Sequence, residues 1–259
     1  MELPVNRFKR GLGSGDVQYG LWLGLPDTSA AEIAAGAGFD WLLIDHEHSP
    51  FELRDIMAHL QAMAPYPVAP VVRPVSHDFA LLKKLLDIGV QSFLVPMVDT
   101  AEQARTLART LRYPPEGERG LGTSISRAAR WNQLPDYVQR ANGEICLIVQ
   151  AESVTAMANL EEILAVDGVD GVFIGPSDLA ASMGHIGDAG HPDVATAIDR
   201  ALARIAASGK HGGMFSLDPQ KAAHHVEQGA NFLAVGTDTT LLASATRALA
   251  ARFKTENHS

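Results

Sequence analysis

The sequence predicts a (β/α)8 TIM barrel, one domain spanning residues 1–259. Short apolar segments alternate with amphipathic ones, this alternation gives eight expected strands, and no linker or low-complexity tract divides the chain. A doubly wound open sheet is the alternative. It is disfavoured because no G-x-G-x-x-G motif follows the first expected strand. The GLGSG segment at 11–15 precedes that strand and is expected to be a flexible loop.

The expected strands are mostly continuous apolar runs, which is typical of strands buried on both faces of a parallel sheet. They cover residues 20–25, 41–47, 68–74, 92–98, 145–152, 171–176, 211–216 and 232–238. The amphipathic segments between them are expected to be helices, and several begin with Ser, Thr or Asp and end near Gly. They cover residues 29–38, 52–64, 77–89, 100–111, 153–166, 191–209 and 218–229.

Composition argues against several classes of protein. The formal net charge of −9 gives no support for a nucleic-acid partner, which usually requires a basic face. The single cysteine, Cys146, allows no internal disulfide and fits a reducing compartment. No apolar run approaches the roughly 18 residues needed to cross a bilayer, and the N-terminal segment lacks the features of a signal peptide. We therefore expect a soluble cytoplasmic protein without a membrane partner.

Polar residues gather at the ends of the expected strands. In a barrel enzyme the active site lies at the carboxyl ends of the strands, so these side chains should share one rim. They are Asp45-His46-Glu47-His48, Arg73, Gln150 with Glu152, Gly175-Pro176-Ser177-Asp178, and Thr237-Asp238.

Glu152 and Asp178 follow neighbouring strands, and two ionised carboxylates that close repel each other. A hard divalent cation would remove the repulsion, as in open Mg²⁺ or Mn²⁺ sites. The alternatives are an acid/base pair, as in glycosidases, or a helix cap made by Asp178. Gly175-Pro176-Ser177 opens a short helix whose free amides could hold a carboxylate, or it is an ordinary proline turn.

The basic residues at the rim are also open to two interpretations. Arg73 ends an apolar strand and needs an anionic ligand or a structural partner such as Glu47. His46 and His48 point to the same side if their strand continues. Their spacing differs from H-E-x-x-H, which excludes a zinc-protease motif.

The segment 114–143 is the one long interruption of the pattern. It carries four arginines, Arg119, Arg127, Arg130 and Arg140. Loops of this length inside a domain are usually functional. We expect these arginines to meet an anionic ligand or a second subunit, and a solvated excursion is the alternative.

These segments together resemble the HpcH/HpaI aldolase family, the class II pyruvate aldolases of the 4-hydroxy-2-oxoheptanedioate aldolase type. The resemblance covers about residues 8–250 and runs, in order, through GLWLGL, AGFDWLLIDHEHSP, VVRP, LLDIGVQSFLVPMV, RYPPEGERGLG, GVDGVFIGPSDLAASMG and AVGTDTTLL. It implies a (β/α)8 barrel assembled as a homohexamer, with the C-terminal helix exchanged between subunits. It also implies a divalent metal, Mg²⁺ or Mn²⁺, with Co²⁺ as a further candidate.

The resemblance implies a role for each matching residue. The metal ligands would be Glu152 and Asp178, and the catalytic residues His48, Arg73 and Asp87, with Asp87 pairing with His48 across a subunit interface. The substrate-binding residues would be Arg73, Gln150, Gly175, Pro176, Ser177 and Trp22, supported by Asp45 and Glu47. His46 falls where relatives often carry a smaller residue, and its role stays open.

The expected activity is reversible aldol cleavage of a 4-hydroxy-2-oxo acid into pyruvate and an aldehyde. Its small-molecule partners would be pyruvate or a related 2-oxo acid and the aldehyde, drawn from aromatic-compound catabolism or from sugar acids. His48, oriented by Asp87, would remove the C4 hydroxyl proton, while the metal and Arg73 stabilise the enolate.

Three alternatives stay open at this stage. A lysine Schiff base is disfavoured because Lys83, Lys84, Lys210 and Lys221 all fall on expected helices or helix ends. A coenzyme A thioester lyase of the citrate lyase β-like branch, and a non-catalytic barrel that binds a metal and an oxo acid, are the other two.

Overall fold

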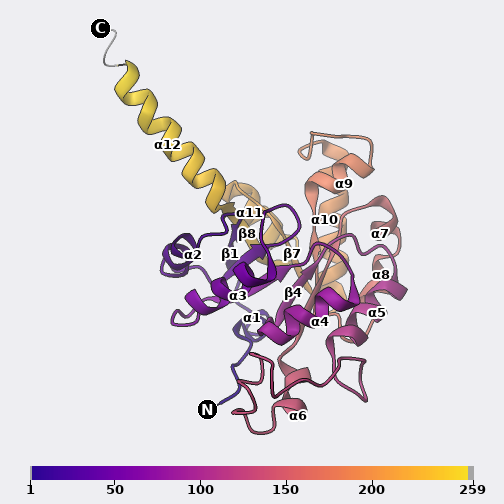
Figure 1. Ribbon diagram of the computed structural model, residues 1–259. Coiled ribbons are helices and arrows are strands. Elements are labelled where there is room, and N and C mark those ends of the chain that lie inside the picture. Colours follow the sequence, from indigo (N-terminus) through magenta and orange to yellow (C-terminus); the bar gives the residue numbers. More distant parts are fainter. Residues whose placement is uncertain (1, 256–259) are drawn as a thin grey trace.

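Eight parallel strands close into a barrel in the order of the sequence, from β1 to β8, in the computed structural model, which describes residues 2–255 (Figure 1). The strands are β1 (Gln18–Leu23), β2 (Trp41–Asp45), β3 (Ala69–Arg73), β4 (Ser92–Val95), β5 (Cys146–Ala151), β6 (Gly171–Ile174), β7 (His211–Phe215) and β8 (Ala230–Thr237). Each expected strand is present, and β1 pairs with β8 to close the sheet. The (β/α)8 prediction is therefore confirmed.

Helices surround the barrel and connect its strands. They are α1 (Arg7–Leu12), α2 (Thr28–Ala35), α3 (Leu53–Ala62), α4 (Phe79–Ile88), α5 (Ala101–Leu111), α6 (Tyr137–Ala141), α7 (Val154–Ala158), α8 (Leu160–Leu164), α9 (Pro176–Ser182), α10 (Pro192–Ala207), α11 (Pro219–Glu227) and α12 (Asp238–Thr255), with a 3₁₀ turn at Asn142–Glu144. The single helix expected over 153–166 is divided at Asn159, whose side-chain amide donates to the Asp99 carbonyl at 2.8 Å.

Helix α1 was not expected from the sequence, because its last residues belong to the glycine-rich segment 11–15. Asn6 caps it by accepting a hydrogen bond from the Lys9 amide at 3.0 Å. Its Phe8 ring lies 5.7 Å from Trp41 and 5.6 Å from Phe232. Since Trp41 is the first residue of β2, Phe8 packs against the amino-terminal end of the barrel interior.

The segment 114–143 lies at this same amino-terminal end, where Figure 1 shows α6 on the side of the barrel opposite α9 and α12. The guanidinium of Arg119 is buried, stacks over the Tyr113 ring at 4.3 Å and donates to the Tyr137 hydroxyl at 2.9 Å. Arg127 donates to the Ile88 carbonyl at 2.7 Å. Two of the four arginines therefore hold the segment to its own barrel.

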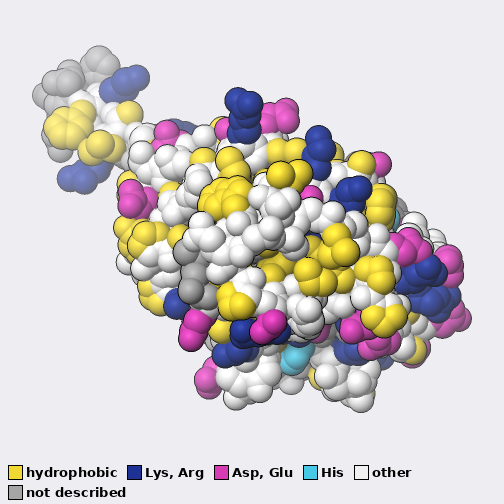
Figure 2. All heavy atoms as spheres, turned by 60° about the horizontal axis from the view of Figure 1, so that its bottom comes forward, with side chains coloured by type: hydrophobic (Ala, Val, Ile, Leu, Met, Phe, Trp, Pro, Cys, Tyr) yellow, Lys and Arg dark blue, Asp and Glu magenta, His cyan; other side chains and the backbone are white. Residues whose placement is uncertain are grey.

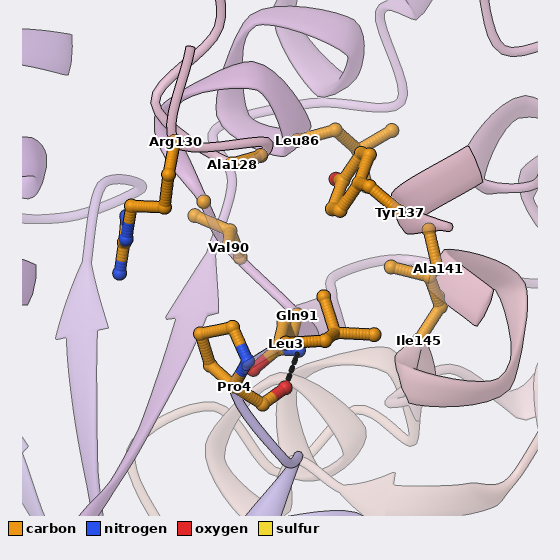
Figure 3. Close-up of a pocket in the computed structure, with 11 residues that line it drawn as sticks. Leu3, Pro4, Leu86, Val90, Gln91, Ala128, Arg130, Tyr137, Ala141 and Ile145 are labelled. Atoms are coloured by element: carbon orange, nitrogen blue, oxygen red, sulfur yellow. Dashed lines mark hydrogen bonds between the residues drawn. The ribbon is translucent and has the colours of Figure 1, made fainter. Parts of the chain in front are cut away.

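A small cavity lies between this segment, α4 and the N-terminal residues (Figure 3). Its walls include Leu3, Leu86, Val90 and Tyr137, and its volume is about 30 Å³, room for a water molecule or two. It is a packing void and too small for a metabolite.

Helix α12 projects away from the barrel (Figure 1). Leu241, Leu242 and Leu249 on it are 55%, 55% and 54% exposed. Figure 2 shows hydrophobic side chains on its projecting end as well as between charged ones on the body of the molecule. Within residues 2–255, α12 and the other helices are either too short or too polar to cross a bilayer.

Candidate active site

An open pocket of about 590 Å³ lies at the carboxyl ends of the strands. Ten of the predicted site residues line it: Trp22, Asp45, His48, Arg73, Gln150, Glu152, Gly175, Pro176, Ser177 and Asp178. Glu47 lies beside the pocket in contact with Arg73, and Asp87 lies elsewhere. The expected convergence of strand ends on one rim is thus present in the structure.

Arg73 is held by two carboxylates from the end of β2. Its Nε and Nη2 donate to the two oxygens of Asp45 at 2.9 and 2.7 Å, and its Nη1 lies 2.9 Å from Glu47. The register of β2 and β3 places Asp45 opposite Arg73. The Trp22 indole donates to Asp45 at 3.2 Å and lies under the guanidinium at 4.9 Å. The arginine is therefore fixed in a bidentate geometry with its charge facing the pocket.

The two carboxylates respond differently to this arrangement. Burial favours a higher pKa for Asp45, but the hydrogen bonds and charge of Arg73 outweigh it and lower the pKa below its ordinary value. Burial raises the pKa of Glu47 despite Arg73, and the charges of Asp45 and Asp178 add to the rise. Glu47 therefore contacts Arg73, as the sequence interpretation expected, and Asp45, the other residue expected to support the site, is its bidentate partner.

Glu152 is a buried carboxylate that lines the pocket directly after the end of β5. Burial raises its pKa to about 7; the Met97 amide opposes this shift, and the nearby charges of Asp178 and Glu47 increase it. The Met97 N–H donates to one oxygen at 2.8 Å, and Gln150 Nε2 donates to the other at 2.8 Å. Met97 adopts a left-handed backbone with φ of 53°, which is strained for a residue with a side chain and directs its amide at Glu152.

These residues fit a hard divalent cation. Within the described chain, neither Glu152 nor Asp178 forms an ion pair with Lys or Arg, so their charges lack a direct counter-charge. A Cβ on Gly175 would lie 2.2 Å from Glu152 Oε2, so only glycine leaves space for this carboxylate. Gln150 Oε1 is buried without a hydrogen-bond partner. Oxygen donors of this kind are those that Mg²⁺ and Mn²⁺ prefer.

Helix α9 begins at this carboxylate pair. Gly175 is its N-cap, Pro176 its first residue, and Asp178 lies in the first turn. Asp178 therefore does not occupy the cap position, and the interpretation of this residue as a helix cap is wrong. Pro176 has no N–H, so the amides of Ser177 and Asp178 are the ones that a first turn offers to an anion.

The two histidines after β2 take different positions. The strand ends at Asp45, so the alternation that would have placed them on one side does not continue. The His48 side chain is 68% exposed, lines the pocket, and has Nε2 3.7 Å from Glu47. His46 is outside the pocket lining, its amide donates to the Arg73 carbonyl at 3.0 Å, and its Nδ1 is buried without a partner.

Asp87 and His48 are not brought together within one chain. Asp87 is the penultimate residue of α4, which runs from the end of β3 back to the start of β4, at the amino-terminal end of the barrel. It lies 3.7 Å from Arg119. Burial raises its pKa, and the charges of Arg119 and Lys83 oppose that rise. Only a second copy of the chain could place an Asp87 beside this pocket.

The sequence interpretation expected Trp22 at the site but missed the two phenylalanines that pack beside it. The Trp22 ring lies 5.7 Å from both Phe173 and Phe215, and both phenylalanines line the pocket. They lie inside apolar runs that are buried on both faces, so no alternation marks which residues face the interior. Ser49, Gly24, Thr237 and Thr239 complete the wall.

Comparison with known proteins agrees with this arrangement. Residues 18–245 match the model of the HpcH/HpaI aldolase/citrate lyase family. The chain is 56% identical to a hydroxypyruvate/pyruvate aldolase of Pseudomonas aeruginosa over 98% of its length and 95% of the relative's. It is 54% identical to a 4-hydroxy-2-oxo-heptane-1,7-dioate aldolase of Escherichia coli, over 96% and 95%.

The solved structures agree with the sequence comparisons. An HpcH/HpaI aldolase/citrate lyase family protein from Burkholderia cenocepacia superimposes with a TM-score of 0.92 at 40% identity, covering 96% of this chain and 100% of that one. A barrel with acidic, basic and aromatic side chains converging at the carboxyl ends of its strands is the architecture of a barrel enzyme. The chain belongs to the HpcH/HpaI aldolase/citrate lyase family.

Proposed function

We propose that this protein catalyses the reversible, divalent-metal-dependent aldol cleavage of 4-hydroxy-2-oxo acids into pyruvate, or a related 2-oxo acid, and an aldehyde. The observation that carries the proposal is that the buried Glu152 and Asp178 line the same pocket as the fixed guanidinium of Arg73. The names of the aldolase relatives support the same reaction class.

In this proposal Glu152 and Asp178 hold the cation, which would be Mg²⁺ or Mn²⁺, with Co²⁺ also accepted. When bound, a divalent ion supplies Lewis-acid stabilisation of negative charge on the substrate. Gln150 orients Glu152 through its 2.8 Å hydrogen bond. The amides of Ser177 and Asp178 would bind the substrate carboxylate at the start of α9.

Arg73 would act on the keto oxygen of the substrate. Because Asp45, Glu47 and Trp22 fix its guanidinium before any ligand arrives, little reorganisation accompanies charge development at that oxygen. His48 would accept the C4 hydroxyl proton as the C3–C4 bond breaks, and the electron pair of that bond forms the enolate. The aldehyde leaves, and a proton delivered to C3 completes pyruvate.

We further propose that the active enzyme is a homohexamer in which α12 packs on a neighbouring copy. Its exposed leucines support this, as do Leu121, Ile125 and Trp131 of segment 114–143, which are 72%, 84% and 56% exposed. The Ala128 amide of that segment donates to the Asp87 carbonyl at 3.0 Å, so an apolar contact surface adjoins Asp87. Packing of this surface on a neighbour would place Asp87 beside that neighbour's His48. The cytoplasmic location stays a prediction from the sequence.

The first test is pyruvate release from a panel of 4-hydroxy-2-oxo acids, with and without EDTA and with Mg²⁺, Mn²⁺ or Co²⁺ added back. We expect EDTA to abolish release and the metals to restore it. Glu152→Gln should lose release even in excess metal, whereas Glu162→Gln, an exposed carboxylate on α8, should behave as wild type.

Two other outcomes would redirect the assignment. EDTA-resistant release would contradict the metal mechanism, and borohydride trapping with pyruvate would then test for a Schiff base, although no lysine of the described chain lines the pocket. No release from any substrate would leave the thioester lyase and the binding-only barrel.

A further inference from the structure

We propose that His185, His191 and Asp193 form a second metal site, separate from the pocket, that takes a late first-row transition-metal ion such as Zn²⁺. His185 and His191 lie on the segment that joins α9 to α10, and Asp193 lies in the first turn of α10, at the end of the molecule where Figure 1 shows α9 and its following loop. None of them lines the candidate active site.

The ligand atoms already converge. His185 Nε2 lies 3.6 Å from Asp193 Oδ2, and His191 Nδ1 lies 3.7 Å from the same oxygen. All three potential ligand atoms lie within 4.8 Å of one another. Ligands at about 2.1 Å from a tetrahedral or octahedral ion are separated by about 3.0–3.4 Å, so the distances need little change. Because imidazole lone pairs lie in the ring planes, the two nearly parallel rings must also rotate before both can face one ion.

The backbone holds the two histidines in place. The His185 amide donates to the Ala180 carbonyl at 2.7 Å, Asp188 donates to the His185 carbonyl at 3.0 Å, and the His191 amide donates to the Asp188 carbonyl at 3.1 Å. The imidazole rings stack with centroids 3.6 Å apart and an interplanar angle of 14°.

The His191 tautomer is also suitable. Its Nδ1 accepts the Asp193 amide at 3.2 Å, so a lone pair is present on the atom that faces Asp193. Metal binding would replace this single hydrogen bond. Asp193 lies in the first turn of α10, and its side chain is 69% exposed, so an ion can enter from solvent and keep water ligands.

The ligand set differs in kind from that of the pocket. Two imidazoles and one carboxylate favour Zn²⁺, Ni²⁺ or Cu²⁺, whereas the oxygen donors of Glu152 and Asp178 suit Mg²⁺ or Mn²⁺. An ion here would link the two ends of the segment 185–191 and so fix the connection from α9 to α10. This site does not depend on the proposed aldolase chemistry.

The test is a calorimetric titration of the metal-free, full-length protein with Zn²⁺. For wild type we expect one ion at this cluster, in addition to any Zn²⁺ that the proposed pocket site takes in excess metal. His185→Phe keeps an aromatic ring on His191 but removes a ligand, and it should bind one Zn²⁺ ion fewer than wild type. His224→Phe is the matched control, because His224 also faces a carboxylate, Asp199 at 3.1 Å, but belongs to no such cluster.

Asp193→Asn provides a second variant that keeps side-chain size, and it should also lose the site. Glu152→Gln should retain it, so failure of the proposed pocket metal would appear as a separate result. Equal thermal midpoints of the metal-free variants would show that the fold is intact. The proposal is overturned if His185→Phe and Asp193→Asn bind as many Zn²⁺ ions, with the same affinity, as wild type.

Discussion

At the scale of single residues, Gly175 determines how the part of the pocket that carries the proposed metal ligands can be built. Its backbone lies so close to Glu152 Oε2 that a methyl group would lie 2.2 Å from that oxygen. The contact joins the end of β6 to the end of β5, so the glycine fixes the position of one proposed metal ligand relative to the helix that carries the other.

Gly175→Ala should therefore displace Glu152 and lower kcat for pyruvate release by about 100-fold, the effect of roughly an ångström of misplacement. It should also weaken Mg²⁺ binding measured by calorimetry. Gly143→Ala is the control, because its Cβ would meet no atom within 4 Å and should change neither quantity. Normal Mg²⁺ affinity in Gly175→Ala would contradict the role assigned to Glu152.

The raised pKa of Glu152 predicts how stability depends on pH in the absence of metal. Its pKa is 4.5 ordinarily and about 7 in the folded protein, so between these values the folded state holds a proton that the unfolded state releases. The contribution of Glu152 to the free energy of unfolding should thus be fully present below pH 4.5 and should fall as the pH rises to 7, by up to about 3 kcal/mol.

Urea unfolding in EDTA between pH 4.5 and 8 measures this slope. Glu152→Gln cannot release a proton and should flatten the curve over that range, while Mg²⁺ should restore wild-type stability above pH 7. Identical slopes for the two proteins would show that Glu152 is not the group responsible.

Most of this site could be predicted because polar and charged residues stand at the carboxyl ends of the strands. Arg73, Glu152 and Asp178 stand out against apolar runs in the sequence, and barrel topology brings them to one rim. The choice of Asp45 as the main partner of Arg73 depends on strand register and could not be predicted. Phe215 was missed because nothing in an apolar run distinguishes the pocket side from the helix side.

At the scale of elements, the sequence predicted the strands well and the boundaries of the helices less well. Every strand was expected because its run is apolar and bounded by turn residues. Helix α1 was missed because it is short and ends in glycines, and its stability comes from Phe8 packing on Trp41 and Phe232, contacts that are distant in sequence.

Phe8→Ala should therefore destabilise the protein by about 3–5 kcal/mol, as for other buried phenylalanines. The measurement is the urea midpoint at constant slope. Ile33→Ala, on α2 and 77% exposed, should change stability by less than about 0.5 kcal/mol. A small effect of Phe8→Ala would mean that α1 is not part of the core.

At the scale of the whole molecule, Asp87 and His48 lie at opposite ends of one barrel. The proposed assembly makes the active site shared: each pocket would take His48 from one copy and Asp87 from the next. This sharing can be tested without a structure of the assembly.

His48→Ala and Asp87→Asn should each have low activity alone, and co-expressed they should regain about one quarter of the wild-type activity, because random neighbours create intact sites. Co-expression of His48→Ala with Arg73→Lys is the control, because both changes lie on the same copy's side of the pocket. Absence of complementation in the first pair would contradict the shared site.

The contact between Phe8 and Phe232 also constrains synthesis of the chain. Phe8 and β1 are made before the other seven strands, whereas their partners Phe232 and β8 are made only after β2 to β7. Closure of the barrel must therefore wait for almost the entire polypeptide, a route dominated by contacts of large sequence separation and correspondingly slow. Until then the open edges of β1 and the latest strand expose apolar surface, so nascent chains that stall before residue 230 should depend on chaperones to stay out of aggregates.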